Sequence, residues 1–312
     1  MRLVSGWIDL QVNGYAGVDF NADTLTLPEV IGACERLRTD GVERIFATII
    51  TAPMESMIAK INRMAKWINE VPEIGRTIGG LHIEGPFLSP LDGYAGAHPR
   101  DAIHPATIDA AKRLVDAGEG NVRLMTLAPE CDKLANVTRE LTTMNIAVAA
   151  GHSNASLDDL NRSIDAGLCL FTHLGNACPN LMPRHDNIIQ RVLSLSDRLS
   201  ISLIADGHHL PGFVLKNMTR CIAPQRIIIV SDAISAAGLG PGQYQLSGQT
   251  VHVDSDGATW AECRTHFAGC ATTLNRMQHI LRTETDWDEH TIRSAMIDNP
   301  RTLVERSTGC RL

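Results

Sequence analysis

The feature that most constrains the fold is a regular alternation of short apolar runs with longer segments of helical period. Eight runs rich in Val, Ile and Leu recur along the chain, at residues 7–13, 42–51, 78–87, 122–130, 145–153, 168–176, 199–207 and 226–233. Runs of this length, apolar on both faces, are typical of parallel strands buried between helices. The pattern therefore predicts a parallel α/β fold.

The intervening segments carry apolar residues at spacings of three and four. They span residues 54–71, 105–117, 133–144, 156–166, 188–195 and 212–221, and Ser156 followed by Asp158 and Asp159 is a typical helix start. Strict alternation implies right-handed βαβ units, and eight units over ~250 residues suit a closed (β/α)8 TIM barrel. A doubly wound open sheet is the alternative. The first strand lacks the Gly-x-Gly-x-x-Gly turn of its dinucleotide-binding form.

Residues 242–260 interrupt the alternation. Alternating polarity with Ser-Gly and Asp-Gly turns predicts a small β-hairpin inserted before the last helix. The sequence contains neither repeats nor a linker, so we expect residues 1–312 to form a single barrel domain.

Composition limits the partners and the compartment. The net charge of the 312 residues is -7 and no run of Lys and Arg occurs, so nucleic acid is not an expected partner. The sequence contains no apolar stretch of roughly 18 residues, as a membrane span requires. Its first residues show no apolar region after a charged start, so we expect no signal peptide. Eight scattered cysteines without a Cys-x-x-Cys pair suit reduced thiols. We expect a cytoplasmic protein that acts on a small molecule.

Ionisable residues gather where the predicted strands end. Glu84 ends the third strand, His152 the fifth, His173 the sixth and Asp232 the eighth. In a closed barrel these ends converge on one mouth, where barrel enzymes place their catalytic residues. Two imidazoles and a carboxylate are a suitable ligand set for Zn²⁺, and an aspartate facing the ion could serve as a base. Each residue alone could be a hydrogen-bonded or helix-capping side chain, but the joint pattern favours a metal site.

Several stretches resemble the N-acetylglucosamine-6-phosphate deacetylase family of the amidohydrolase superfamily. They are IDLQVNG (8–14), LHIEGPF (81–87), GAHP (96–99), LAPE (127–130), AGHSNAS (150–156), THLGNACP (172–179), IADGHHL (204–210), SDA (231–233) and AGC (268–270), in the family's order through nearly the whole chain. The resemblance implies that Glu84, His152 and His173 bind the metal. It also implies that Asp232 takes a proton from the attacking water and passes it to the leaving amine.

The same resemblance implies a set of substrate contacts. The residues that match the family's sugar-phosphate contacts are His98, Asn176, Ala177, Arg184 and His209. Arg184 is the expected phosphate ligand, because a guanidinium pairs with phosphate in bidentate fashion. Without the family, a solvated loop arginine would be the simpler interpretation of Arg184.

Three departures from the family's pattern affect these expectations. Many amidohydrolases carry His-x-His on the first strand, whereas this chain has Gln11-Val12-Asn13. Gln11 and Asn13 would mark a vestigial second metal site, so we expect one divalent ion, Zn²⁺ by default, with Fe²⁺, Co²⁺ or Mn²⁺ as alternatives. Both ends of the chain are short, so the accessory β-sandwich is expected to be missing or strongly reduced, and a homodimer would cover the exposed barrel surface. The loop after His173 is unusual, and Cys270 replaces the family's usual serine.

The sequence is compatible with three functions. The first is hydrolysis of the acetamide of N-acetylglucosamine 6-phosphate to glucosamine 6-phosphate and acetate. The second is deacetylation of another N-acyl compound, such as a different amino sugar. The third is a catalytically inactive barrel that acts as a binding protein, although a retained metal set and base argue against it.

Overall fold

The fold is built around one parallel sheet of eight strands. The chain's computed structural model describes residues 6–246, 248–264 and 266–312. Residues 1–5, which the predicted domain includes and on which the expected absence of a signal peptide depends, lie outside the described residues. The strands follow the order β1-β4-β5-β6-β7-β8-β9-β10. Their bounds are β1 Trp7–Val12, β4 Val42–Ile50, β5 Ile78–Glu84, β6 Val122–Leu127, β7 Ala147–Ala150, β8 Leu168–Phe171, β9 Ser200–Leu203 and β10 Ile227–Ile229.

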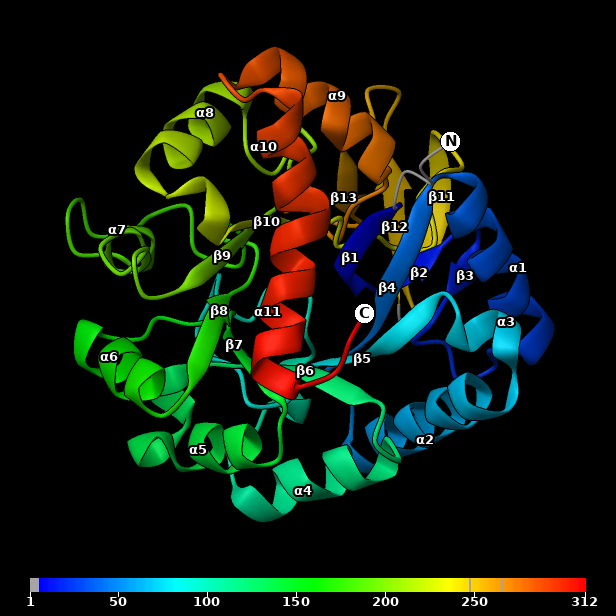
Figure 1. The fold of residues 1–312 in the computed structure, drawn as a ribbon, viewed down its shortest axis with the longest axis horizontal. Helices are drawn as coiled ribbons and strands as arrows, with labels where there is room; N and C mark the ends of the chain where they lie inside the picture. Colours follow the sequence, from blue (N-terminus) through cyan, green and yellow to red (C-terminus); the bar gives the residue numbers. More distant parts are fainter. Residues whose placement is uncertain (1–5, 247, 265) are drawn as a thin grey trace.

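The sheet curls into a barrel, and a β-bridge between its first and last segments closes it. Beyond β10, Ala233 forms a parallel bridge with Val12 at the end of β1, and its carbonyl accepts hydrogen bonds from the N–H groups of Asn13 (2.7 Å) and Gly14 (3.1 Å). Helices surround the strands on the outside (Figure 1). The predicted (β/α)8 barrel is confirmed, and the open-sheet alternative is wrong.

The helices follow the predicted periodicity. The outer helices are α1 Leu27–Thr39, α2 Met54–Glu70, α3 Pro72–Gly75, α4 Ile108–Ala117, α5 Asn136–Thr143, α6 Leu157–Asp165, α7 Ile188–Leu193 and α8 Gly212–Cys221. Helix α6 begins as expected: the Ser156 hydroxyl accepts a hydrogen bond from the Asp159 N–H at 3.1 Å and donates to the Asp159 carboxylate at 2.7 Å. This reciprocal capping satisfies donors that the first helical turn leaves free.

Several strands end earlier than the sequence predicts, and backbone conformation gives the reason. β7 ends at Ala150, β8 at Phe171 and β10 at Ile229, so the ionisable residues lie in the loops that follow. His152, His173 and Asp232 have φ angles of +51°, +34° and +51°. A left-handed backbone cannot continue a strand, so the strands cannot extend through these three residues as the sequence predicts.

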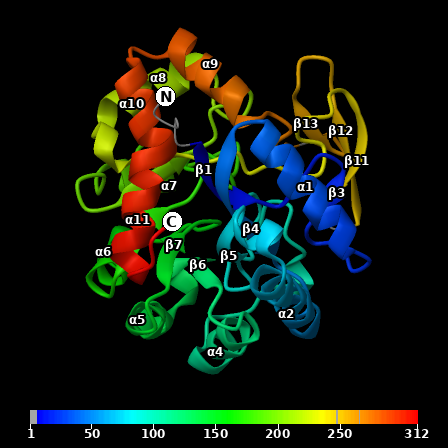
Figure 2. The ribbon, with the colours of Figure 1, turned by 45° about the vertical axis from the view of Figure 1, so that its right-hand side comes forward.

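The region of the expected hairpin holds a small antiparallel sheet of three strands. They are β11 Gly242–Leu246, β12 Gln249–Val253 and β13 Thr259–Ala261, and a minor pair, β2 Gly14–Tyr15 and β3 Val18–Asp19, lies near the end of β1. Figure 2 shows the small sheet standing to one side of the barrel. It has its own apolar core, which includes Ile234, Val251 and Ala268.

The C-terminal helices pack on the barrel in two places: the first of them joins the outer ring beside α8, and the last lies against β1 and β10. They are α9 Leu274–Glu284, α10 Glu289–Arg293 and α11 Asn299–Thr308, with a π-helical segment, η5 Ser294–Asp298, before α11. The Asn299 amide donates to the carbonyl of Ile227, the first residue of β10, at 2.7 Å. Short 3₁₀ turns complete the structure at η1 Arg100–Ala102, η2 Pro129–Cys131, η3 Lys133–Ala135 and η4 Pro224–Arg226. In the described part of the chain, we find no helix long and apolar enough to span a membrane.

Candidate active site

Glu84 lies at the centre of the ionisable cluster at the barrel mouth. Its Oε1 is 3.0 Å from Nε2 of His173 and 3.4 Å from Nε2 of His152. All three side chains are buried. Two atoms bound at about 2.0–2.1 Å to a tetrahedral ion lie roughly 3.3 Å apart. The separations therefore fit edges of a metal coordination shell, and the structure brings the three predicted ligands together.

The hydrogen bonds of His152 support this interpretation. Its Nδ1 lies 2.9 Å from the carbonyl oxygen of Tyr94, which can only accept, so Nδ1 carries the proton. The unprotonated Nε2 then points its lone pair toward Glu84, as a metal ligand must. Nδ1 of His173 is buried without a hydrogen-bond partner among the described residues. The donor set and the outer contact of His152 thus fit a divalent ion, whereas His173 has no such contact among the described residues.

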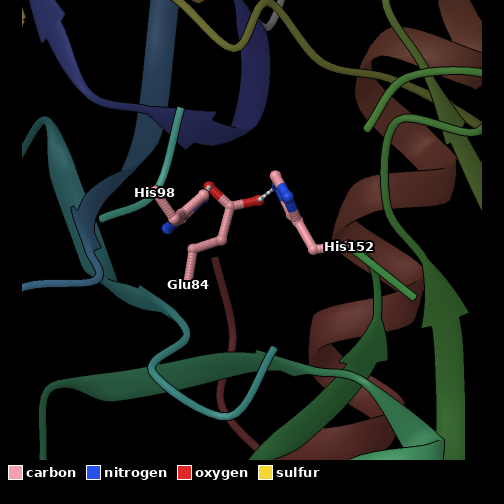
Figure 3. Close-up of side chains that lie close together, drawn as sticks. All are labelled: Glu84, His98 and His152. Carbon is pink, nitrogen blue, oxygen red and sulfur yellow. Dashed lines mark ion pairs between the residues drawn. The ribbon is translucent and has the colours of Figure 1, made fainter. Parts of the chain in front are cut away.

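A third histidine, His98, approaches the other side of Glu84. Figure 3 shows His98 and His152 on opposite oxygens of the carboxylate, and Nε2 of His98 is 3.9 Å from Oε2. Ligand atoms of Glu84, His98 and His152 lie within 4.8 Å of one another, so His98 is a fourth candidate ligand. Its Nδ1 is held by the Thr51 hydroxyl at 2.8 Å. The closer contacts of His173, and its approach to the same oxygen as His152, favour the predicted triad.

Burial and the neighbouring rings set the charge of this cluster. Burial tends to raise the pKa of Glu84. When His152 and His173 carry a proton on the nitrogen that faces this carboxylate, their hydrogen bonds and charges outweigh burial and hold the pKa of Glu84 well below its usual value. Burial also lowers the pKa of His98 to about 3, helped by repulsion from His152. Glu84 is therefore an anion and His98 a neutral imidazole at neutral pH.

Asp232 faces the cluster and is held by two amides. Its Oδ1 accepts hydrogen bonds from Asn13 Nδ2 at 2.7 Å and from Gln11 Nε2 at 3.2 Å. Gln11 Nε2 also contacts Oε1 of Glu84 at 2.9 Å, while Gln11 Oε1 accepts from the Thr172 hydroxyl at 2.6 Å. Both amide nitrogens are thus turned toward carboxylates. In this orientation Gln11 and Asn13 present hydrogen-bond donors, not lone pairs, to the two carboxylates.

The environment of Asp232 suits a base that works near neutrality. Burial, followed by the negative charge of Glu84, raises the pKa of Asp232 to about 6, against the lowering effects of His173 and Asn13. A carboxyl group of this pKa can take up and release a proton near pH 7, as general acid–base catalysis requires.

A cavity of about 630 Å³ opens above the cluster. It is lined at its base by Glu84, His152, His173, Asp232 and Asn13. Four of the five predicted substrate contacts also line it, namely His98, Asn176, Ala177 and His209. Arg184 and Gln11 are not among its described lining residues. The structure therefore leaves Arg184 outside the cavity of its own chain.

The structure adds lining residues that the sequence did not reveal. Arg100 is the only arginine or lysine among the described residues that line the cavity, and its guanidinium pairs with exposed Asp92 at 2.5 Å. Trp260 and Phe267 come from the small sheet and its following loop, with ring centroids 4.4 Å apart. Arg100 follows His98 by two residues in the sequence, a proximity that could have indicated it.

A second buried cluster lies beside the first. Oδ2 of Asp206 is 2.7 Å from His209 Nδ1 and 3.5 Å from the Cys270 thiol. These three ligand atoms are close enough together to hold a cation, but they are already engaged in hydrogen bonds with one another. The charge and hydrogen bonds of His209, and the N–H groups of His208 and His209, outweigh burial and lower the pKa of Asp206.

Comparison with known proteins shows to which family the chain belongs. No family model matches it. It is 33% identical to human N-acetylglucosamine-6-phosphate deacetylase over 98% of this chain and 76% of that protein. It is 31% identical to N-acetylgalactosamine-6-phosphate deacetylase of Escherichia coli O157:H7, over 80% of this chain and 65% of that protein. The chain belongs to the N-acetylglucosamine-6-phosphate deacetylase family.

Solved structures agree with this membership of the deacetylase family. The N-acetyl-D-glucosamine-6-phosphate deacetylase of Mycobacterium smegmatis, solved as a mutant with N-acetyl-D-glucosamine-6-phosphate, superposes with a TM-score of 0.87 at 26% identity. The match covers 99% of this chain and 80% of that one. The described residues thus combine the fold of this deacetylase family with a candidate metal-binding group at the barrel mouth.

Proposed function

We propose that this protein hydrolyses the acetamide of N-acetylglucosamine 6-phosphate to glucosamine 6-phosphate and acetate. The observation that carries the proposal is the convergence of Glu84, His152 and His173 at the base of a cavity that Asp232 also lines. A non-catalytic binding protein has no need for a metal set beside a base of raised pKa. Family membership supports the same reaction.

Glu84, His152 and His173 would hold one divalent metal ion. Zn²⁺ is the expected ion for two imidazoles and a carboxylate, with Fe²⁺, Co²⁺ and Mn²⁺ as alternatives. When bound, the ion polarises the acetamide carbonyl and makes a water molecule more acidic. Gln11 and Asn13 donate hydrogen bonds to carboxylates. This supports a single bound ion and a vestigial second site that binds none.

Asp232 moves the proton in this mechanism. Asn13 and Gln11 hold its Oδ1, so we assign the proton transfer to Oδ2. The carboxylate accepts a proton from the water that attacks the acetamide carbonyl. It then delivers this proton to the departing nitrogen as the carbon–nitrogen bond breaks, and acetate and the free amine leave.

The cavity residues would orient the sugar. His98, Asn176, Ala177 and His209 line the cavity around the metal set, and we propose that they contact the substrate. Arg184 remains the proposed phosphate ligand. Because it lies outside its own cavity, it reaches the phosphate only if its loop moves or a second copy of the chain supplies it. We propose a homodimer of single-domain barrels spanning residues 1–312, acting in the cytoplasm.

One alternative substrate has support of its own. The relative from Escherichia coli O157:H7 is named as a deacetylase of the galactosamine epimer. It is 31% identical to this chain, close to the 33% identity of the human protein. The family match therefore leaves the sugar epimer to be decided by experiment. Deacetylation of another N-acyl amino sugar is the second candidate.

Acetate release tests the proposal directly. Metal-loaded wild type and Asp232→Asn are compared on N-acetylglucosamine 6-phosphate, N-acetylgalactosamine 6-phosphate and free N-acetylglucosamine. We expect release from the first sugar and loss of at least ~100-fold in kcat for the variant, since general acid–base groups typically contribute 10²–10⁴-fold. No acetate from any sugar, from protein shown to contain metal, contradicts the assignment.

A further inference from the structure

Asp206 is a buried carboxylate that the proposed reaction does not use. It follows β9, is 5% exposed, and does not line the main cavity. Its two oxygens have separate partners. Oδ1 accepts backbone hydrogen bonds from His208 at 2.9 Å and His209 at 2.8 Å, whereas Oδ2 faces His209 Nδ1 at 2.7 Å and, more distantly, the Cys270 thiol at 3.5 Å. The two backbone donors prevent the carboxylate from rotating away from the imidazole.

This arrangement determines which ring nitrogen of His209 carries a proton. Oδ2 of an ionised Asp206 can only accept, so His209 Nδ1 must be the donor. The ring is also packed against Phe267, with centroids 5.0 Å apart. Since Nδ1 is engaged by Asp206 and His209 lines the cavity, Nε2 is the nitrogen left for a ligand. In the neutral ring this Nε2 is an acceptor.

We propose that Asp206 is a positioning residue that fixes His209 with Nδ1–H toward the carboxylate, so that Nε2 accepts a hydrogen bond from a sugar hydroxyl of the substrate. The inference rests on the proposed function for the identity of the ligand. It specifies that the ligand presents a hydroxyl donor at this wall of the cavity. The tautomer itself is a property of the free protein and can be measured without any substrate.

Asp206→Asn is an isosteric test with a defined consequence. The two backbone N–H groups require an acceptor at the Oδ1 position, so the amide oxygen of the asparagine must stay there. Its NH₂ group then faces His209 Nδ1, which has to become the acceptor. The proton moves to Nε2, and the ring presents a donor to the cavity. The equivalent change in a Ser-His-Asp triad acts through the same switch of tautomer.

The first measurement is the tautomer of His209 by ¹⁵N NMR of histidine-labelled protein, with His209→Phe to assign its signals. We expect Nδ1–H with an unprotonated Nε2 in the wild type and the reverse in Asp206→Asn. A wild-type ring that carries a proton on Nε2 at the assay pH overturns the proposal, whatever the substrate proves to be.

The second measurement is steady-state kinetics on the substrate that the acetate assay identifies. Asp206→Asn should lower kcat/KM, mainly through KM, by roughly 10- to 100-fold, the size of effect that outer partners of metal-bound histidines show. In the His209→Phe background, which keeps the aromatic packing, the same substitution should have no further effect. An equal loss in both backgrounds would mean that Asp206 does not act through His209. Asp165→Asn, at an exposed ion pair with Arg198, is the matched control, and thermal unfolding checks that each variant is folded.

Discussion

Asp9 offers a quantitative test of the electrostatics beneath the candidate active site. It lies on β1 and is 2% exposed. Its Oδ1 accepts backbone hydrogen bonds from Ser231 at 3.1 Å and Gln11 at 3.2 Å, so it ties together the segments that carry Asp232 and the Gln11 amide. Burial raises the pKa of Asp9 from 3.8 to about 7, with a smaller contribution from Asp232, against the lowering effect of its hydrogen bonds to Ser231 and Gln11.

The raised pKa predicts that Asp9 destabilises the fold as pH increases. The folded state holds the proton more tightly than the unfolded chain, so this contribution to stability is complete below pH 3.8 and is lost as pH rises to about 7. Each pKa unit is worth about 1.4 kcal/mol, which makes the whole effect about 4 kcal/mol, of which about 3 kcal/mol falls between pH 5 and pH 8. Asp9→Asn removes this titration and keeps an acceptor for the two backbone donors.

Urea unfolding of wild type and Asp9→Asn at pH 5 and pH 8 measures the difference. Titrating groups that do not interact with Asp9 affect both proteins equally, so they cancel in the comparison; Asp232, whose charge contributes to the pKa of Asp9, is the exception. We expect the free energy of unfolding of the wild type to fall, relative to the variant, by about 3 kcal/mol between the two pH values. A difference that is independent of pH would refute the raised pKa, and a relative rise would refute its sign.

Two further predictions concern the metal and the phosphate. Glu84→Gln should reduce bound metal well below one ion per chain, whereas Asp232→Asn should retain it, as measured by elemental analysis. Adding Zn²⁺ at about 100 times its Kd should raise the free energy of unfolding of metal-free wild type by about 2.7 kcal/mol. The same addition should stabilise Glu84→Gln much less. Equal metal content in both variants would contradict the ligand assignment. Arg184→Gln should raise KM for the phosphorylated sugar roughly 10- to 100-fold, as expected for loss of hydrogen bonds between charged groups, and leave KM for the free sugar unchanged. Arg100→Gln is its matched control, and an effect confined to Arg100→Gln would assign the phosphate to the arginine inside the cavity.

The amino-acid sequence was sufficient to predict the barrel and the convergence of four ionisable residues at its mouth. Parallel strands buried on both faces need continuous apolar runs, and this local requirement is visible without any tertiary information. Barrel topology then places the ends of all strands at one mouth. Glu84, His152, His173 and Asp232 could therefore be grouped although almost 150 residues separate the first from the last. The strand ends were placed too late because nothing in the sequence marks His152 or Asp232 as left-handed.

The orientation of the side chains around these four residues depends on contacts that exist only in the folded chain. The orientation of the Gln11 amide depends on Glu84, Asp232 and Thr172, which come from three other segments. The small sheet brings Trp260 and Phe267 to the cavity, and loop paths put Arg100 inside it and Arg184 outside. Strand periodicity specifies which residues reach the barrel mouth. The direction of a hydrogen bond and the path of a loop depend on contacts between segments distant in the chain, so they appear only once the chain has folded.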